Sequence, residues 1–243
     1  MMRVLSLFAG IGGFDLGLER AGYRTVRFVE KDPFCQRVLA KHWPGVPCDD
    51  DVTTAEFEEG EADVVVGGFP CQDISYAGEG AGLAGARSGL WGELLRAIRL
   101  VRPINAIVEN VAALLDRGMG VVLGDLADIG YDTEWDCISA CALGATHMRR
   151  RVFIMAHPHC KHGRSWLRYP PSRQVGKIQV LDGFESARAR QRARMADPSA
   201  LYGGADGLPN GSHRNRAIGN SIYPAIPELI GRALLTPEVT PHV

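Results

Sequence analysis

The 243-residue sequence lacks three features that would each indicate a particular class of protein. Its six cysteines are too few and too irregularly spaced for the disulfide framework of a small secreted domain, so we expect reduced thiols. No stretch approaches the roughly 18 apolar residues that a membrane-spanning helix requires. Glycines at 10, 12 and 13 interrupt the apolar N-terminus that a signal peptide would need. These absences predict a cytoplasmic protein with no membrane partner.

An overall excess of charge of one sign is also missing, but the balance is uneven along the chain. The formal net charge is -1, from 27 basic and 28 acidic residues, which taken alone argues against a polyanion as partner. Residues 1–156, however, carry 15 Lys and Arg against 22 Asp and Glu, whereas residues 157–218 carry 11 against 4. A basic segment is therefore hidden within an acidic body.

What the sequence does contain is an alternation of short apolar runs and helical patterns. The composition, 46% hydrophobic and 23% charged, is that of a globular domain. Short apolar runs between helices are typical of buried parallel strands. We therefore predict a doubly wound, Rossmann-like α/β sheet that binds ligands at the carboxyl ends of its strands. The predicted strands are 4–8, 25–29, 63–66, 105–108 and 152–155, and the predicted helices are 13–21, 33–42, 90–101 and 111–129.

The alternation changes after His157 and returns near the C-terminus. Residues 157–215 lose the strand and helix pattern and carry arginines at 188, 190, 192 and 194, and an apolar helix is predicted over 222–235. We therefore divide the chain into an α/β domain (1–156), a short basic segment (157–215) and a C-terminal helix (216–243).

The first predicted strand runs into a glycine turn, Phe8-Ala9-Gly10-Ile11-Gly12-Gly13, and then into a helix. Glycines at such a turn let a ligand approach the backbone closely. A dinucleotide fingerprint needs a third glycine where this chain has Asp15, which disfavours a nicotinamide oxidoreductase. A nucleoside is still compatible, because Glu30 could accept the ribose hydroxyl protons and Asp51-Val52 could receive an adenine amino group. The alternative is that the glycines only form a tight turn and the acidic residues only cap helices.

The third predicted strand leads directly into Gly67-Gly68-Phe69-Pro70-Cys71-Gln72, which places a cysteine at the carboxyl edge of the sheet. A thiolate there can act as a nucleophile, although a small buried hydrophobe is the commoner role of cysteine. Glycines at 78, 80, 82, 85 and 89 follow, a pattern suited to a lid that closes over a substrate. This context favours the catalytic interpretation of Cys71.

Two further predicted strands bring ionisable side chains to the same region. One ends in Glu109-Asn110-Val111, so a carboxyl group of raised pKa could donate a proton to a ring nitrogen there. Another begins at Arg149-Arg150-Arg151, where strand alternation directs Arg149 and Arg151 to one face and Arg150 to the other. A solvated basic edge is the alternative for this triplet.

Six motifs follow one another over nearly the whole chain. They are Phe8-Ala9-Gly10-Ile11-Gly12-Gly13-Phe14, Gly68-Phe69-Pro70-Cys71-Gln72, Arg87-Ser88-Gly89-Leu90-Trp91, Glu109-Asn110-Val111, Arg149-Arg150-Arg151-Val152-Phe153 and Gly219-Asn220-Ser221-Ile222. Together, and in this order, they resemble the DNA cytosine-5 methyltransferase family in its compact bacterial or phage-like form. The resemblance implies transfer of a methyl group from S-adenosyl-L-methionine to C5 of cytosine in double-stranded DNA, with the base flipped out of the duplex.

The resemblance also implies a role for each matched residue. Cys71 adds to C6 of the cytosine, Glu109 binds N3 and the exocyclic amine, and Arg151, supported by Arg149, holds O2. The implied cofactor contacts are Phe8, Ala9, Gly10, Ile11, Gly12, Glu30, Asp51, Val52, Pro70, Leu90 and Asn220. The implied substrate contacts are Phe69, Gln72, Ser75, Arg87 and Asn110.

The match departs from the family in two places. His147 occupies a position where glutamine is common, and the region between Phe153 and Gly219, which normally carries target recognition, is short. This region is either a compact recognition lobe or the sign of a catalytically weak or silent relative that binds DNA or S-adenosylmethionine. Its basic excess predicts phosphate affinity in both cases. The resemblance leaves open a cognate restriction endonuclease, as in a restriction-modification system, and a monomeric state.

A metal site is the competing interpretation of the remaining cysteines and histidines. Cys137, Cys141 and the 157–162 segment supply metal-ligand types. Their spacing is not that of a strong zinc pattern, and Cys137 and Cys141 are expected in or near a strand. We therefore predict no metal.

Overall fold

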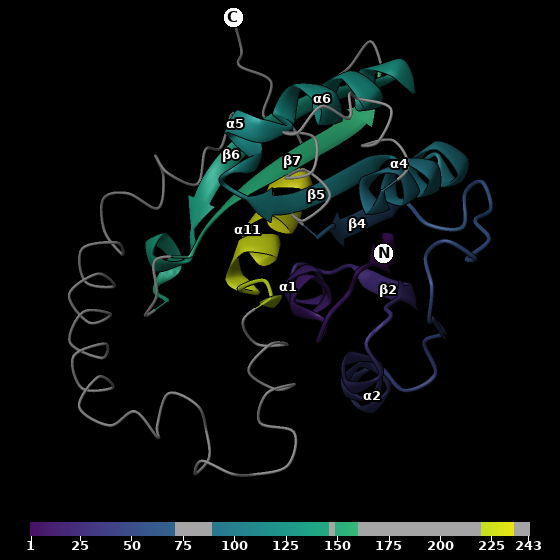
Figure 1. Cartoon of the computed structure of the whole chain (residues 1–243). Helices are drawn as coiled ribbons and strands as arrows, with labels where there is room; N and C mark the ends of the chain where they lie inside the picture. The colour runs from purple at the N-terminus through teal and green to yellow at the C-terminus, as the bar shows by residue number, and fades with distance from the viewer. Residues whose placement is uncertain (71–88, 146–148, 160–219, 236–243) are drawn as a thin grey trace, which may run out of the picture.

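The computed structural model describes residues 1–70, 89–145, 149–159 and 220–235, which form a seven-stranded sheet with helices on both faces (Figure 1). The strand order is β3-β2-β1-β4-β5-β7-β6. Neighbours from β3 to β5 pair in parallel, and β7 runs antiparallel to both β5 and β6. The predicted Rossmann-like α/β fold is confirmed.

The helices and strands have the following bounds. The strands are β1 (Arg3–Leu7), β2 (Arg24–Val29), β3 (Cys48–Asp49), β4 (Val64–Gly68), β5 (Asn105–Val111), β6 (Tyr131–Ser139) and β7 (Arg150–Pro158). The helices are α1 (Gly13–Arg20), α2 (Pro33–His42), α4 (Leu90–Val101), α5 (Leu114–Arg117), α6 (Met119–Asp128) and α11 (Ala225–Leu235), with a 3-10 helix η3 (Ala140–Leu143).

Each face of the sheet carries its own hydrophobic core, because alternate residues of a strand point to opposite faces. Val65 of β4 packs with α4 and α6 on one face, whereas Val64 and Val66 pack with α1 and α11 on the other. The first of these cores receives five buried residues from α4, at helical spacing: Trp91, Leu94, Ala97, Ile98 and Val101.

The C-terminal helix α11 packs directly on α1, far from it in the sequence (Figure 1). A Cβ at Gly17 of α1 would collide with the backbone carbonyl of Pro224. From the other side, Gly231 of α11 lies close to α1, and its carbonyl accepts a hydrogen bond from the Tyr23 hydroxyl at 3.1 Å. Because Gly17 and Gly231 have no side chains, the two helices approach closely. This close packing holds residues 220–222 beside the N-terminal glycine turn.

Some predicted elements were wrong in detail. The predicted helix 111–129 is two helices, because β5 continues to Val111, which pairs with Arg151, and the backbone of Gly118 is not helical (φ -174°, ψ 0°). The run 152–155 belongs to an antiparallel strand and not to a parallel one. Strand β6 was missed because its sequence is mostly polar. It lies at the edge of the sheet and pairs only with β7, a position where polar side chains are tolerated. The last helix begins at Ala225, three residues after its predicted start.

The start of α2 is confirmed as predicted. The Asp32 carboxylate accepts a hydrogen bond from the backbone N–H of Phe34 at 2.8 Å, and Pro33 occupies the first helical turn. This cap satisfies an N–H group that has no partner within the helix and fixes where the chain leaves β2.

The basic segment 157–215 lies outside the described residues from position 160 onward. Cys137 lies in β6 and Cys141 in η3, as expected, and the described residues contain no group of His, Cys, Asp and Glu side chains suited to a metal ion. Helices long and apolar enough to cross a bilayer are likewise missing from the described ranges.

Candidate functional site

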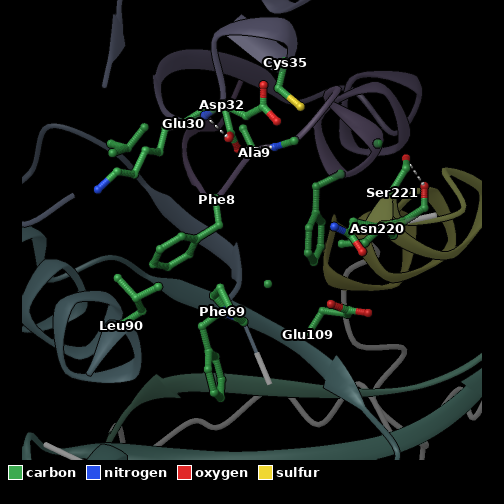
Figure 2. Close-up of a pocket in the computed structure, with 18 of the residues that line it drawn as sticks. Phe8, Ala9, Glu30, Asp32, Cys35, Phe69, Leu90, Glu109, Asn220 and Ser221 are labelled. Atoms are coloured by element: carbon green, nitrogen blue, oxygen red, sulfur yellow. Dashed lines mark hydrogen bonds between the residues drawn. The ribbon is translucent and has the colours of Figure 1, made fainter. Parts of the chain in front are cut away.

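A cavity of about 660 Å³ opens at the carboxyl ends of the parallel strands (Figure 2). This volume lies within the roughly 300–1,000 Å³ that is typical of small-molecule sites. Segments that are distant in sequence meet there because every parallel strand ends at the same edge of the sheet. The lining residues are 8–10, 13–14, 29–32, 35, 51–53, 68–70, 90, 109–111, 149, 151 and 220–222.

The turn between β1 and α1 forms one wall of the cavity. Phe8, Gly10 and Gly12 have left-handed φ values of 53°, 56° and 81°, so the chain reverses tightly before α1 begins. A Cβ at Gly12 would collide with the Trp43 ring, so packing excludes a side chain there. A Cβ at Gly10 would meet no atom within 4 Å, because Gly10 faces the open cavity.

The lining therefore includes part of the predicted glycine turn. Phe8, Ala9 and Gly10 line the cavity, whereas Ile11 and Gly12 do not. Gly12 instead contributes to the packing of the turn against the end of α2.

Backbone N–H groups hold Glu30 in place at the end of β2. Gly10 N–H donates to Oε2 at 2.7 Å and Asp32 N–H donates to Oε1 at 2.8 Å. A carboxylate oxygen can accept two hydrogen bonds, so each oxygen retains capacity for a ligand hydroxyl. Glu30 thereby joins the glycine turn to the neighbouring strand at the place predicted for the ribose.

Asp51 begins a turn that forms another wall. Its carboxylate accepts hydrogen bonds from the Thr53 N–H at 2.9 Å, the Thr53 hydroxyl at 2.7 Å and Lys31 Nζ at 3.2 Å. These bonds, above all those from Thr53, lower the pKa of Asp51 to about 2. The carboxylate is therefore a hydrogen-bond acceptor at neutral pH, beside the apolar side chains of Val52 and Leu90.

Glu109 lies at the carboxyl end of β5 and is 8% exposed. Its Oε1 lies 2.9 Å from Arg151 Nε. Burial raises the pKa of Glu109, against the lowering influence of Arg151 and Arg149, so the carboxyl group is predisposed to hold a proton. Gly68 of the neighbouring strand β4 leaves room for the Glu109 carboxyl group, because a Cβ at Gly68 would lie only 2.8 Å from Glu109 Oε2.

The arginine triplet is arranged as predicted. Arg149 and Arg151 both line the cavity, whereas Arg150 is exposed. Burial lowers the pKa of Arg149, and so does the like charge of Arg151. Two guanidinium groups thus face the same carboxyl group of Glu109.

Asn110 connects β5 to the chain that leads to Cys71. Its side chain is 2% exposed; Nδ2 donates to the Phe69 carbonyl at 3.0 Å, and Oδ1 accepts from the Val111 N–H at 2.8 Å. The Phe69 ring packs against Trp91 with centroids 5.2 Å apart. These contacts hold the backbone that immediately precedes Pro70, the last described residue before Cys71.

Several predicted residues, and most of the predicted lid, lie outside the described residues. Of the other predicted residues, Pro70, Leu90 and Asn220 line the cavity. The site residues outside the described ranges are Cys71, Gln72, Ser75 and Arg87, and the glycines at 78, 80, 82 and 85 lie there too.

Sequence reasoning missed some lining residues. Most of them adjoin a predicted residue, so continuing each motif by a few positions would have found them. Cys35 has no such signal, because it reaches the cavity only through the first turn of α2. Burial raises the pKa of its thiol to about 12. The missed residues are Gly13, Phe14, Val29, Lys31, Asp32, Cys35, Thr53, Gly68, Val111, Ser221 and Ile222.

Comparison with known proteins assigns the family. The model of the C-5 cytosine-specific DNA methylase family matches residues 2–179. The chain belongs to this family. The predicted resemblance is thereby confirmed.

Two curated relatives and one solved structure show how far this chain resembles known proteins. Type II methyltransferase M2.BsuMI of Bacillus subtilis is 39% identical over 163 residues, which cover 64% of this chain and 42% of that protein. Type II methyltransferase M.AquIA of Picosynechococcus sp. is 30% identical over 209 residues, covering 74% and 82%. The DNMT2 structure of Spodoptera frugiperda shares the fold, with a TM-score of 0.64, 11% identity and coverage of 97% and 100%.

The chain spans less than half the length of the first curated relatives that it matches. The matched parts cover 42%, 44% and 38% of their lengths. The chain therefore matches less than half of each of these relatives.

Proposed function

We propose that this protein transfers a methyl group from S-adenosylmethionine to C5 of a flipped cytosine in double-stranded DNA, through a covalent bond between Cys71 and C6. The observation that carries the proposal is one cavity that joins the glycine turn and Glu30 to Glu109 and Arg151. Figure 2 shows Phe8 and Glu30 across the open space from Glu109. A donor and an acceptor bound in the two parts would face each other.

The lining suits S-adenosylmethionine. Glu30 would accept from the ribose hydroxyls and Asp51 from the adenine amino group, while Phe8 and Leu90 offer apolar surface to the rings. Gly10 leaves open space where a side chain would project. When bound, the cofactor supplies a methyl group on a positively charged sulfur, and the nearby carboxylates favour a cation.

The residues at the other end would make cytosine reactive. C5 of cytosine is a poor nucleophile, and addition of the Cys71 thiolate to C6 converts the ring into an enamine. Glu109, whose raised pKa favours the protonated acid, would give a hydrogen bond or its proton to N3 during this addition. Arg151 would hold O2 of the base.

The remaining steps restore the ring. C5 of the enamine would take the methyl group that bound S-adenosylmethionine would supply, and the electron pair of the broken carbon–sulfur bond would stay on sulfur. Loss of the C5 proton to a base would then return an electron pair to the ring as the Cys71–C6 bond breaks and the thiolate departs, and a proton taken up by N3 would return to Glu109. The product is 5-methylcytosine.

Replacing the proposed nucleophile tests this function directly. Cys71→Ser should reduce methyl incorporation into cytosine-containing duplex DNA to background, because a hydroxyl is far less ionised than a thiol at neutral pH. Transfer of radiolabelled methyl groups measures this. Cys48→Ser is the matched control, since Cys48 is exposed and outside the cavity lining. Unaltered incorporation by Cys71→Ser would contradict the proposal.

A covalent trap separates an enzyme from a silent relative. Wild-type protein should form a stable adduct with duplex DNA that carries 5-fluorocytosine, because fluorine cannot leave C5 as a proton does. A silent binder would retain S-adenosylmethionine and give no adduct. Bisulfite sequencing of DNA from expressing cells would then identify the target site, and the Type II names of the relatives support a place in restriction-modification.

A further inference from the structure

The wall formed by Asp51 and Val52 belongs to a segment, residues 51–57, that contains no helix or strand. Within it, the Ala55 N–H donates to the Asp51 carbonyl at 3.0 Å, which closes a turn. The carbonyls of Val52 and Ala55 need other partners, since buried backbone groups are costly without hydrogen bonds. The segment therefore depends on donors from elsewhere in the molecule.

Arg96 of α4 supplies those donors. Its Nη2 donates to the Val52 carbonyl at 2.6 Å and to the Ala55 carbonyl at 3.2 Å, and its Nη1 donates to the Ala55 carbonyl at 3.1 Å. Its Nε donates to Glu93 at 2.6 Å, one turn earlier on the same helix, which orients the guanidinium. The planar guanidinium group of Arg96 thus binds the side of the turn that faces away from the cavity, whereas the opposite side of the turn lines the cavity.

A second arginine supports the same segment. The guanidinium carbons of Arg96 and Arg27 lie 4.9 and 5.4 Å from the ring centroid of Phe57. Arg27 donates to the Glu56 carbonyl at 2.8 Å and forms an ion pair with Glu61 at 3.0 Å. The segment is therefore bound to α4 through Arg96 and to β2 through Arg27.

We propose that Arg96 is a positioning residue for the methyl donor, an inference that rests on the proposed function. Arg96 does not line the cavity. It donates a hydrogen bond to the backbone carbonyl of Val52, and Val52 does line the cavity. Helix α4 also supplies Leu90 to the cavity, so the same helix contributes to the lining directly and supports Val52 through Arg96. A lysine could not replace the planar fork, because its ammonium group is a single point donor without a fixed geometry.

Donor binding by the full chain tests this role. Arg96→Met should weaken the Kd for S-adenosylmethionine, measured by calorimetry, about tenfold, and Arg96→Lys about threefold. The KM for the donor should rise in parallel, while kcat at saturating donor and the KM for DNA stay within about twofold. Arg99→Met is the matched control, because Arg99 is exposed on the same helix, and it should bind like wild type.

A change of base in the ligand separates positioning from a general loss of stability. Wild type should prefer S-adenosylhomocysteine to its inosine analogue, which lacks the amino group that Asp51 would accept from. Arg96→Met should lose much of this preference. If Arg96→Met does not fold, the same preference between the two ligands can be measured with Arg96→Lys, which is the milder substitution.

The outcomes distinguish the two proposals. Wild-type protein that binds no S-adenosylmethionine would overturn the proposed function and this inference with it. Wild type that binds, together with Arg96 variants of unchanged donor affinity and base preference, would overturn the role of Arg96 alone. Arg96 variants with a lower kcat and an unchanged KM for the donor would also overturn the role of Arg96.

Discussion

Asp15 is a fully buried carboxyl group in the first turn of α1. Ser6 of β1 donates to it at 3.0 Å and Thr25 of β2 donates at 2.9 Å. Burial raises the pKa of Asp15 from 3.8 to about 6, more than the two hydroxyl groups lower it. The residue that excludes a dinucleotide fingerprint in the sequence is thus a link between α1 and two strands in the structure.

Asp15 should make the free energy of unfolding depend on pH. The unfolded chain releases this proton near pH 3.8 and the folded chain near pH 6, so ionisation between these values favours the unfolded state. The contribution of Asp15 is therefore fully present below about pH 3.8 and falls by about 3 kcal/mol as the pH rises through 6. Urea unfolding should show that wild type loses about 1 kcal/mol more than Asp15→Asn between pH 5 and 7.5. Parallel pH profiles of the two proteins would contradict this.

At the scale of elements, the contact between α1 and α11 decides whether the cavity is complete. Asn220, Ser221 and Ile222 line it, and only two residues separate them from the start of α11. A Cβ at Gly13 would collide with the Ile222 carbonyl, as one at Gly17 would with Pro224. The cavity wall is therefore coupled to how closely the two helices pack.

A methyl group at this contact should separate the helices. Gly17→Ala should lower the free energy of unfolding by roughly 1–3 kcal/mol, the usual cost of overpacking, and weaken S-adenosylmethionine binding. Gly124→Ala is the matched control, because Gly124 is an exposed residue within α6 and a Cβ there would meet no atom within 4 Å. That variant should gain up to about 1 kcal/mol from helix propensity and bind normally. Thermal unfolding and calorimetry measure both effects, and equal behaviour of the two variants would contradict the packing argument.

At the scale of the whole molecule, charge is divided by position along the chain. Glu30, Asp32, Asp51 and Glu109 belong to the acidic body and line one cavity. The basic excess lies in 157–218, largely outside the described residues. A net charge of -1 is thus compatible with a protein that binds both a cationic cofactor and a polyanion.

The basic segment should account for salt-sensitive DNA binding. Replacing Arg188, Arg190, Arg192 and Arg194 by glutamine should weaken binding to duplex DNA and reduce the slope of log K against log salt by about 0.9 for each DNA phosphate that the variant no longer neutralises. Binding of S-adenosylmethionine should not change. Fluorescence anisotropy at several salt concentrations measures the slope, with Arg99→Gln in the acidic body as control. An unchanged slope in the fourfold variant would mean that other residues bind the phosphates.

Local patterns predicted much of the fold and the site. The glycine turn, the start of α2 at Asp32 and the alternation that directs Arg149 and Arg151 to one side are all set by neighbouring residues, and the structure has them. Strand β6 could not be predicted in the same way, because its polar sequence becomes a strand only by pairing with β7. The break at Gly118 likewise lies inside a run that is helical in pattern.

By itself the sequence determined the family, the α/β class and the candidate set around Cys71, Glu109 and Arg151, because motifs and periodicity are properties of short stretches of chain. Only the tertiary structure decided that α11 packs against α1 through Gly17 and Gly231, and that Arg96 holds the carbonyl of Val52. These contacts join residues that lie far apart in the sequence. They arise from the packing of helices on a shared sheet, which no short stretch of sequence contains.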